Sequence, residues 1–157
     1  MATGVTPVAG YPLSSPEADT SPAVRSAGCA AVCDAAPDSA RFLASVLAGA
    51  GFEVITCTTA AACEAAVAAR HPDLVVASIL LPDLDGLALA RRLRLRRNVA
   101  EGGPRIILVS TLHARQRALE AGADAFLLKP VAPADLLAAT TGRSPPVVAA
   151  TGFEASP

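Results

Sequence analysis

The run Leu74-Val75-Val76-Ala77-Ser78 and the loop Leu81-Pro82-Asp83-Leu84-Asp85-Gly86 that follows it decide the fold of this chain. The run is apolar up to its last residue and shows no polar alternation, which predicts a strand buried on both faces, as in a parallel sheet. Gly86 then opens a stretch in which Leu87, Ala90 and Leu93 recur with helical period. A buried strand, a short loop and an amphipathic helix together indicate a βαβ unit.

The same pattern continues on both sides of this unit, so the sequence predicts an α/β fold with five strands and five helices. The predicted strands are Cys29–Cys33, Glu53–Cys57, Leu74–Ser78, Arg105–Ser110 and Ala125–Lys129. The predicted helices begin at Pro37, Thr59, Gly86, Ala114 and Ala134, and all but the third have predicted ends, at Gly51, Arg70, Gly122 and Ala139. Because the connections are short and parallel crossovers are right-handed, we expect a doubly wound parallel sheet of the flavodoxin-like type.

Both ends of the chain differ in composition from its middle. Residues 1–27 and 140–157 are rich in Pro, Ser, Thr and Gly and lack an apolar period, so we expect flexible tails around one folded domain, residues 28–139. The chain is 52% hydrophobic but only 3% aromatic, which predicts a core of Ala, Val, Leu and Ile and a modest stability.

Charge and hydropathy exclude several classes of function. A net charge of −1 does not supply the basic surface that nucleic-acid binding needs. The dense run Arg91, Arg92, Arg94, Arg96 and Arg97 is therefore interpreted as a solvated helix face. No apolar run reaches the ~20 residues of a membrane span, and the stretch after Met1 lacks a basic region typical of a secretory signal. We therefore expect a soluble, cytoplasmic protein.

The four cysteines, Cys29, Cys33, Cys57 and Cys63, show no CxxC spacing. Cys29 and Cys33 are four residues apart, a spacing that can place metal ligands on a helix, but the apolar residues between them favour a buried strand. We expect all four to be reduced core residues, because free cysteine is among the most buried residue types.

Polar residues stand at the carboxyl ends of the predicted strands. Asp34 follows the first strand, and Ser78, Ser110 and Lys129 close the third, fourth and fifth. In doubly wound sheets, ligands and chemistry gather at this edge, so we expect these side chains to converge there.

The sequence resembles the receiver domain of two-component response regulators across residues 28–139. The resemblance rests on the order and spacing of four motifs. They are Pro72-Asp73-Leu74-Val75-Val76, Leu81-Pro82-Asp83-Leu84-Asp85-Gly86, Leu119-Glu120-Ala121-Gly122-Ala123-Asp124-Ala125-Phe126 and Lys129-Pro130.

The resemblance implies a role for each residue at the edge. In the family, an aspartate ending the third strand accepts a phosphoryl group from a histidine kinase, and an acidic pair after the first strand helps to bind Mg²⁺. A hydroxyl residue ends the fourth strand and a lysine ends the fifth. Asp34, Ser110 and Lys129 match these positions, whereas Ser78 stands at the phosphoacceptor position and Ala35 at the second acidic position.

These two departures predict that phosphotransfer is lost. A carboxylate is ionised at neutral pH, but a serine hydroxyl is not and needs a base within hydrogen-bond reach. We expect neither His71 nor His113 at this edge. With Asp34 the only expected carboxylate, the Mg²⁺ site should be lost or very weak. Asp83 and Asp85 are interpreted as turn residues, because a calcium loop would need further acidic ligands.

The leading hypothesis is therefore a pseudo-receiver that binds a protein partner without aspartyl phosphorylation, and not an enzyme. The alternative is an active phosphorelay receiver. An enzyme or nucleotide binder has little support, because no Gly-rich loop follows any predicted strand. Partners implied by the resemblance are a histidine kinase, an output regulator or a second copy, with no nucleic acid, membrane or cofactor.

Two expectations concern the switch that active receivers use. Phe126 falls where receivers place an aromatic ring that reports phosphorylation, and the stretch from Ser110 to Ala121 is shorter than usual. By analogy, the contact surface is expected around Leu119, Phe126 and Leu136. Without a phosphoryl group, Lys129 is expected to bridge to Asp34 or Ser78 and to fix one arrangement.

Overall fold

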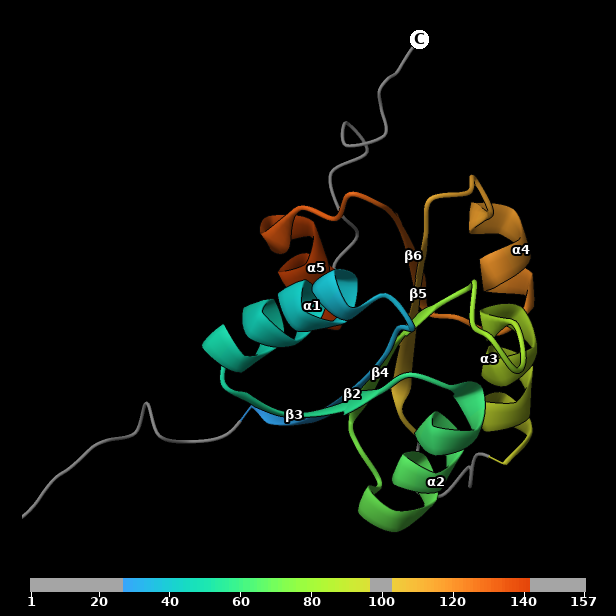
Figure 1. Ribbon diagram of the computed structural model, residues 1–157, viewed down its shortest axis with the longest axis horizontal. Coiled ribbons are helices and arrows are strands. Elements are labelled where there is room, and N and C mark those ends of the chain that lie inside the picture. The colour runs from blue at the N-terminus through green and yellow to red at the C-terminus, as the bar shows by residue number, and fades with distance from the viewer. Residues whose placement is uncertain (1–26, 97–102, 142–157) are drawn as a thin grey trace, which may run out of the picture.

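The computed structural model describes residues 27–96 and 103–141, which form a parallel sheet between two layers of helices (Figure 1). The strands are β2 (Gly28–Cys33), β3 (Phe52–Cys57), β4 (Leu74–Ser78), β5 (Arg105–Ser110) and β6 (Ala125–Leu128). The helices are α1 (Pro37–Gly49), α2 (Ala60–Arg70), α3 (Gly86–Leu95), α4 (Arg115–Glu120) and α5 (Pro133–Thr140). Strands and helices alternate without exception, as the sequence predicts.

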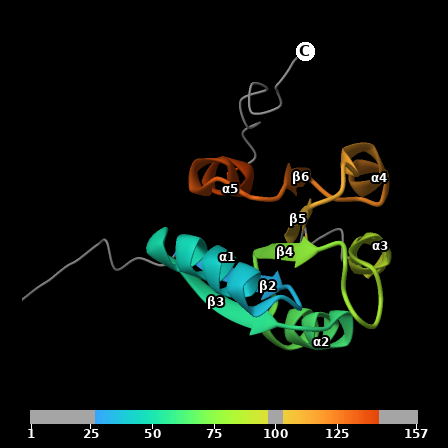
Figure 2. The same cartoon turned by 45° about the horizontal axis from the view of Figure 1, so that its top comes forward.

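The sheet has five strands in the order β3-β2-β4-β5-β6, and all neighbouring strands are parallel. The order reverses after β2, which places the carboxyl ends of β2 and β4 side by side at the switch point where such sheets bind ligands. Helices α1 and α5 cover one face, and α2, α3 and α4 follow one another along the other (Figure 2). This doubly wound architecture confirms the predicted fold class.

The predicted element boundaries agree with the structure to within a few residues. Helices α1 and α4 each end two residues before the predicted end, at Gly49 and Glu120. Strand β6 ends at Leu128, so Lys129 lies just beyond the strand. The expected tails fall almost entirely outside the described residues. No helix in the described ranges is long and apolar enough to cross a membrane.

Helix starts follow from single residues. Pro37 occupies the first turn of α1, where its missing N–H costs nothing. The Thr59 hydroxyl accepts the Ala62 N–H at 3.1 Å and caps α2, and the Asp85 carboxylate accepts the Ala88 N–H at 2.8 Å and caps α3. The Gly86 N–H donates to the carbonyl of Ile79, the residue after β4, so the start of α3 lies directly beside the end of β4.

The core on each face of the sheet is built from small aliphatic residues, as composition predicts. On the α1–α5 face it holds Val32, Leu47, Ile107 and Leu136, among others. On the α2–α3–α4 face it contains Phe126, the one buried aromatic ring of the described residues, together with three cysteines. Cys33, Cys57 and Cys63 are buried as expected, whereas Cys29 is half-buried.

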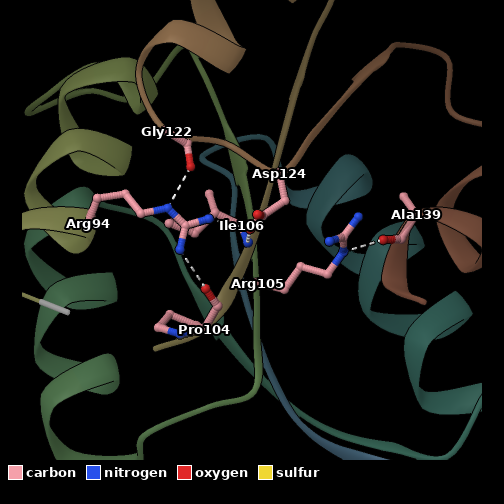
Figure 3. A network of polar contacts seen from close by, with 7 residues as sticks. All are labelled: Arg94, Pro104, Arg105, Ile106, Gly122, Asp124 and Ala139. Carbon is pink, nitrogen blue, oxygen red and sulfur yellow. Dashed lines mark hydrogen bonds and ion pairs between the residues drawn. The ribbon is translucent and has the colours of Figure 1, made fainter. Parts of the chain in front are cut away.

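The expectation that the arginines of α3 form a solvated face is wrong for Arg94, whereas Arg92 is exposed and pairs at the surface with α2. Arg92 makes two bonds to the Glu64 carboxylate of α2, at 2.7 and 3.1 Å. Arg94 points between α3 and the loop before β6, donating to the Gly122 carbonyl at 2.6 Å, the Pro104 carbonyl at 3.1 Å and the Asp124 carboxylate (Figure 3). Arg91 and Arg96 are exposed, and Arg97 lies outside the described residues.

Candidate functional site

The four polar residues that were predicted to converge stand at the carboxyl ends of four strands, along one edge of the sheet. Asp34 follows β2, Ser78 ends β4, Ser110 ends β5 and Lys129 follows β6. Backbone hydrogen bonds join neighbouring strand ends at this edge: the Asp34 N–H donates to the Cys57 carbonyl at the end of β3, and the Lys129 N–H donates to the Ser110 carbonyl at the end of β5. Asp34, Ser78 and Ser110 are buried, with 2%, 4% and 1% of their surface exposed.

Asp34 is the centre of this site and has partners for both carboxylate oxygens. Oδ2 accepts from Lys129 Nζ at 2.9 Å and from the Ser39 hydroxyl at 2.6 Å, and Oδ1 accepts from the Ala36 N–H at 3.0 Å. The predicted bridge of Lys129 therefore goes to Asp34. Ser39, on the first turn of α1, was not identified from the sequence, although a hydroxyl five residues after the aspartate is within reach of it in a loop-to-helix turn.

The carboxyl group of Asp34 stays ionised despite its burial. Burial alone raises its pKa, but the hydrogen bonds from Ser39, Lys129 and the Ala36 amide, together with the positive charge of Lys129, more than offset it, so the pKa lies below its ordinary value. The buried negative charge is thus neutralised from within the chain.

The two serines differ in their surroundings. The Ser110 hydroxyl accepts the Leu112 N–H at 3.0 Å and so holds the turn that leaves β5. Within the described ranges, no carboxylate or imidazole hydrogen-bonds to the hydroxyl of Ser78. Beside Asp34, the exposed Ala35 contributes only a methyl group.

Gly86 brings the start of α3 against Ser78. A Cβ at Gly86 would lie 2.4 Å from the Ser78 carbonyl oxygen and 2.8 Å from the Ile79 Cα, both backbone atoms. The Gly86 N–H also donates to the Ile79 carbonyl at 2.8 Å. Only glycine permits this approach, so the glycine of the fold-deciding loop fixes where helix α3 meets the site.

The residues at this edge do not fit the Mg²⁺ that receivers bind. The Asp34 oxygens are engaged by an ammonium group, a hydroxyl and an amide, whereas Mg²⁺ requires several free oxygen ligands in octahedral geometry. Over the described ranges, no cluster of three or more acidic, histidine or cysteine residues is placed to hold a metal ion.

Asp83 and Asp85 are structural, as the turn interpretation predicts. Both oxygens of Asp83 accept backbone N–H groups at the start of α2, from Ala60 at 2.9 Å and Ala61 at 3.0 Å. These two hydrogen bonds lower the pKa of Asp83. Asp85 caps α3, so the loop between β4 and α3 is tied to two helices.

The expectation that neither histidine lies at this edge is wrong for His113. His71 terminates α2 at the opposite end of the sheet, with a left-handed backbone at φ 46°. His113 lies in the loop directly after β5, which leaves the sheet at the carboxyl edge, and its side chain is exposed.

Two of the three expected contact residues are also wrong. Phe126 is 6% exposed and Leu136 is fully buried, because each points from its element into a core layer rather than outward. Leu119, on α4, is 44% exposed. Leu112, in the loop between β5 and α4, is 47% exposed, and Leu128, at the end of β6, is 40% exposed.

A five-stranded parallel sheet in this order, with an acidic residue after β2, a hydroxyl at the end of β5 and a lysine after β6, has the architecture of the receiver class of signalling domains. The chain belongs to the response regulator receiver domain family, whose model matches residues 30–141. It is 31% identical over 115 residues to the DNA-binding response regulator MtrA of Mycolicibacterium smegmatis, covering 71% of this chain and 48% of that protein.

Further relatives give the same assignment. The transcriptional regulatory protein CusR of Escherichia coli is 41% identical over 68 residues, covering 42% of this chain and 29% of CusR. The BeF3-activated N-terminal receiver domain of RstA from Klebsiella pneumoniae superposes with a TM-score of 0.63 at 29% identity, covering 70% of this chain and 92% of that one. The chain spans less than half the length of these curated relatives.

Proposed function

We propose that this receiver domain acts as a pseudo-receiver, which contacts a protein partner without accepting a phosphoryl group. The observation that carries the proposal is the pairing of Asp34 with Lys129 at 2.9 Å. In receivers, the lysine and the acidic residue serve a phosphoryl group and a metal ion. Here each neutralises the other.

The nucleophile supports the same conclusion. Attack on a phosphorus atom needs an ionised oxygen or a base that removes the proton of a hydroxyl. Ser78 is buried at the end of β4, whereas His113 is exposed in the loop after β5. Among the described residues, no histidine or carboxylate hydrogen-bonds to Ser78 to act as its base.

The test is to incubate the full chain with acetyl phosphate and Mg²⁺ and to measure its intact mass at neutral pH. We expect no adduct on the wild type or on Ser78→Ala. The double variant Ala35→Asp/Ser78→Asp restores both missing carboxylates and should gain a phosphoryl group. A stoichiometric adduct on the wild type would instead establish the active phosphorelay receiver.

A fixed conformation follows from the same pair. A ligand shifts a two-state equilibrium only by its differential affinity for the two states, and a phosphoryl group is the ligand that provides it in active receivers. With Phe126 already buried, we expect no beryllofluoride-dependent change in amide relaxation dispersion at Ser110 or Phe126. Millisecond exchange in the wild type that beryllofluoride quenches would show a working switch.

The contact surface we propose is formed by Leu112, Leu119 and Leu128, around α4 and β6. Helix α4 packs on β6, so these exposed leucines belong to neighbouring elements. The partners proposed for this surface are a histidine kinase, an output regulator or a second copy of the chain. Sedimentation velocity of the wild type and Leu119→Asp over a concentration series tests the second copy. Association that weakens in the variant supports a homodimer, and a monomer at all concentrations excludes it.

A further inference from the structure

Three of the four cysteines meet behind Asp34, at the carboxyl ends of β2 and β3. Cys33 and Cys57 are register partners on these adjacent parallel strands. Cys63 lies in the first turn of α2, and its N–H donates to the Thr59 carbonyl at 3.1 Å. The Cys33 thiol donates to the same carbonyl at 3.3 Å, so one oxygen atom joins the strand and the helix.

This spacing suits a disulfide. Neighbouring strands lie about 4.8 Å apart, which is within the range of Cα separations that a disulfide bridges, roughly 4.4–6.8 Å. Register partners in a parallel pair point to the same face, and all three thiols belong to the core layer beneath α2 and α3. Cys33 and Cys57 can therefore be bridged with little movement of the backbone.

Access to the cluster differs among its members. Cys33 and Cys63 are fully buried, whereas Cys57 retains 6% exposure at the end of β3, an edge strand of the sheet. A small peroxide can therefore approach Cys57 first.

We propose that Cys57 and Cys33 form a peroxide-sensitive thiol pair, which closes to an intramolecular disulfide. The Cys57 sulfur attacks hydrogen peroxide, the O–O bond breaks, and sulfenic acid and water form. The Cys33 sulfur then displaces the hydroxyl of the sulfenic acid, which leaves as a second water. Two thiols lose two electrons and two protons in total, and one peroxide is reduced to two waters.

The ionisation of Cys57 agrees with this order of events. The Cys63 thiol beside it donates a hydrogen bond and lowers the pKa of Cys57 to about 7, although burial opposes the shift. The pKa of Cys63 is raised by its two thiol neighbours and by burial, so Cys63 remains a protonated donor. A thiolate is the form that attacks peroxide, and at neutral pH Cys57 supplies it.

The disulfide would act on the site described above. Asp34 directly follows Cys33, and its N–H donates to the Cys57 carbonyl at 3.0 Å. A covalent bond between the preceding residues fixes this part of the sheet and the position of the Asp34 carboxylate. Oxidation of the cysteines would thereby affect the receiver site without any phosphorylation.

Tryptic mapping of the full-length, folded chain after hydrogen peroxide treatment tests the proposal directly. Arg41 separates Cys33, in peptide 26–41, from Cys57 and Cys63, in peptide 42–70. We expect a cross-linked pair of these peptides and an intact-mass decrease of two hydrogen atoms. A bridge confined to peptide 42–70, intermolecular bridges, or no disulfide before the chain unfolds would each overturn the proposal.

Variants assign the bridge within the peptides. Cys29→Ser should keep the cross-link, because Cys29 pairs with Glu53 at the opposite end of β2. Cys57→Ala and Cys33→Ala should lose it. If either variant is poorly folded by circular dichroism, fragmentation of the cross-linked peptides from Cys29→Ser assigns the bridge instead. A bridge from Cys33 to Cys63 would contradict the proposal.

Discussion

The Nζ atom of Lys129 lies 2.9 Å from Oδ2 of Asp34, although 95 positions of the sequence separate the two residues. The lysine side chain is 20% exposed and the aspartate 3%, so this is a largely buried ion pair. In the sheet, β4 and β5 lie between the strands that carry the two residues. The pair therefore spans the carboxyl edge over all of the positions that the receiver chemistry uses.

Lys129→Met should destabilise the fold by about 1–3 kcal/mol, because it leaves a buried carboxylate without its counter-charge. Asp34→Asn added to Lys129→Met should recover part of this loss, since the amide is neutral. Urea unfolding midpoints measure both. Arg41→Ala, which breaks the fully exposed pair with Asp38, is the matched control and should change stability by less than about 0.5 kcal/mol. Equal effects at the two pairs would contradict the argument.

Acid should weaken the wild type more than Asp34→Asn. The pKa of Asp34 is lowered in the folded state, so its contribution to stability is complete above the unfolded pKa of about 4. That contribution is lost as the pH falls through the lowered folded pKa. The free energy of unfolding, measured from neutral pH downward, should therefore fall more steeply for the wild type below about pH 4. Parallel curves for the two proteins would exclude Asp34 as the source of the acid-dependent loss of stability.

Arg94→Lys should destabilise the domain almost as much as Arg94→Met, by about 2 kcal/mol. The planar guanidinium reaches the Gly122 carbonyl, the Pro104 carbonyl and the Asp124 carboxylate together, and an ammonium group cannot (Figure 3). Asp124 in turn accepts the Ile106 N–H at 2.8 Å, so β5 loses support as well. Arg91→Met, exposed on the same helix, is the control. Thermal unfolding measures the stability of each variant. An Arg94→Lys variant as stable as the wild type would contradict this prediction.

Gly86→Ala and Gly49→Ala should change the stability of the fold in opposite directions. A Cβ at Gly86 meets backbone atoms of Ser78 and Ile79, so α3 must shift and the fold should lose more than about 1 kcal/mol. A Cβ at Gly49, the last residue of α1, meets nothing within 4 Å, so alanine should stabilise the fold by roughly 0.5–1 kcal/mol, chiefly by restricting the unfolded chain. Urea unfolding separates the two, and destabilisation by both substitutions would contradict this contrast.

The sequence predicted the elements of this fold well, because each strand is a short apolar run and each connection carries a local signal. Thr59, Asp85 and Pro37 mark helix starts by chemistry that acts within one turn of the chain. The meeting of Asp34 with Lys129 was also predictable, since both residues follow parallel strands and the two are oppositely charged.

What the sequence could not supply were contacts between side chains and distant backbone. Arg94 resembles its exposed neighbours until α3 is placed against the Gly122 loop, where a positive φ of 106° turns a carbonyl toward it. Asp83 likewise matches an ordinary turn residue, and only the packing of α2 brings two N–H groups to it. Phe126 and Leu136 were misassigned because family analogy names an element, whereas burial depends on which side of that element a residue faces.

The Asp34–Lys129 contact also has a kinetic meaning. One partner follows the first described strand and the other follows the last, so the pair cannot form until the intervening strands have assembled. An interaction of this kind is absent from an early transition state and acts on the native state alone. Removal of the pair should therefore leave the folding rate nearly unchanged and accelerate unfolding. This single ion pair is thus a determinant of the lifetime of the assembled receiver edge.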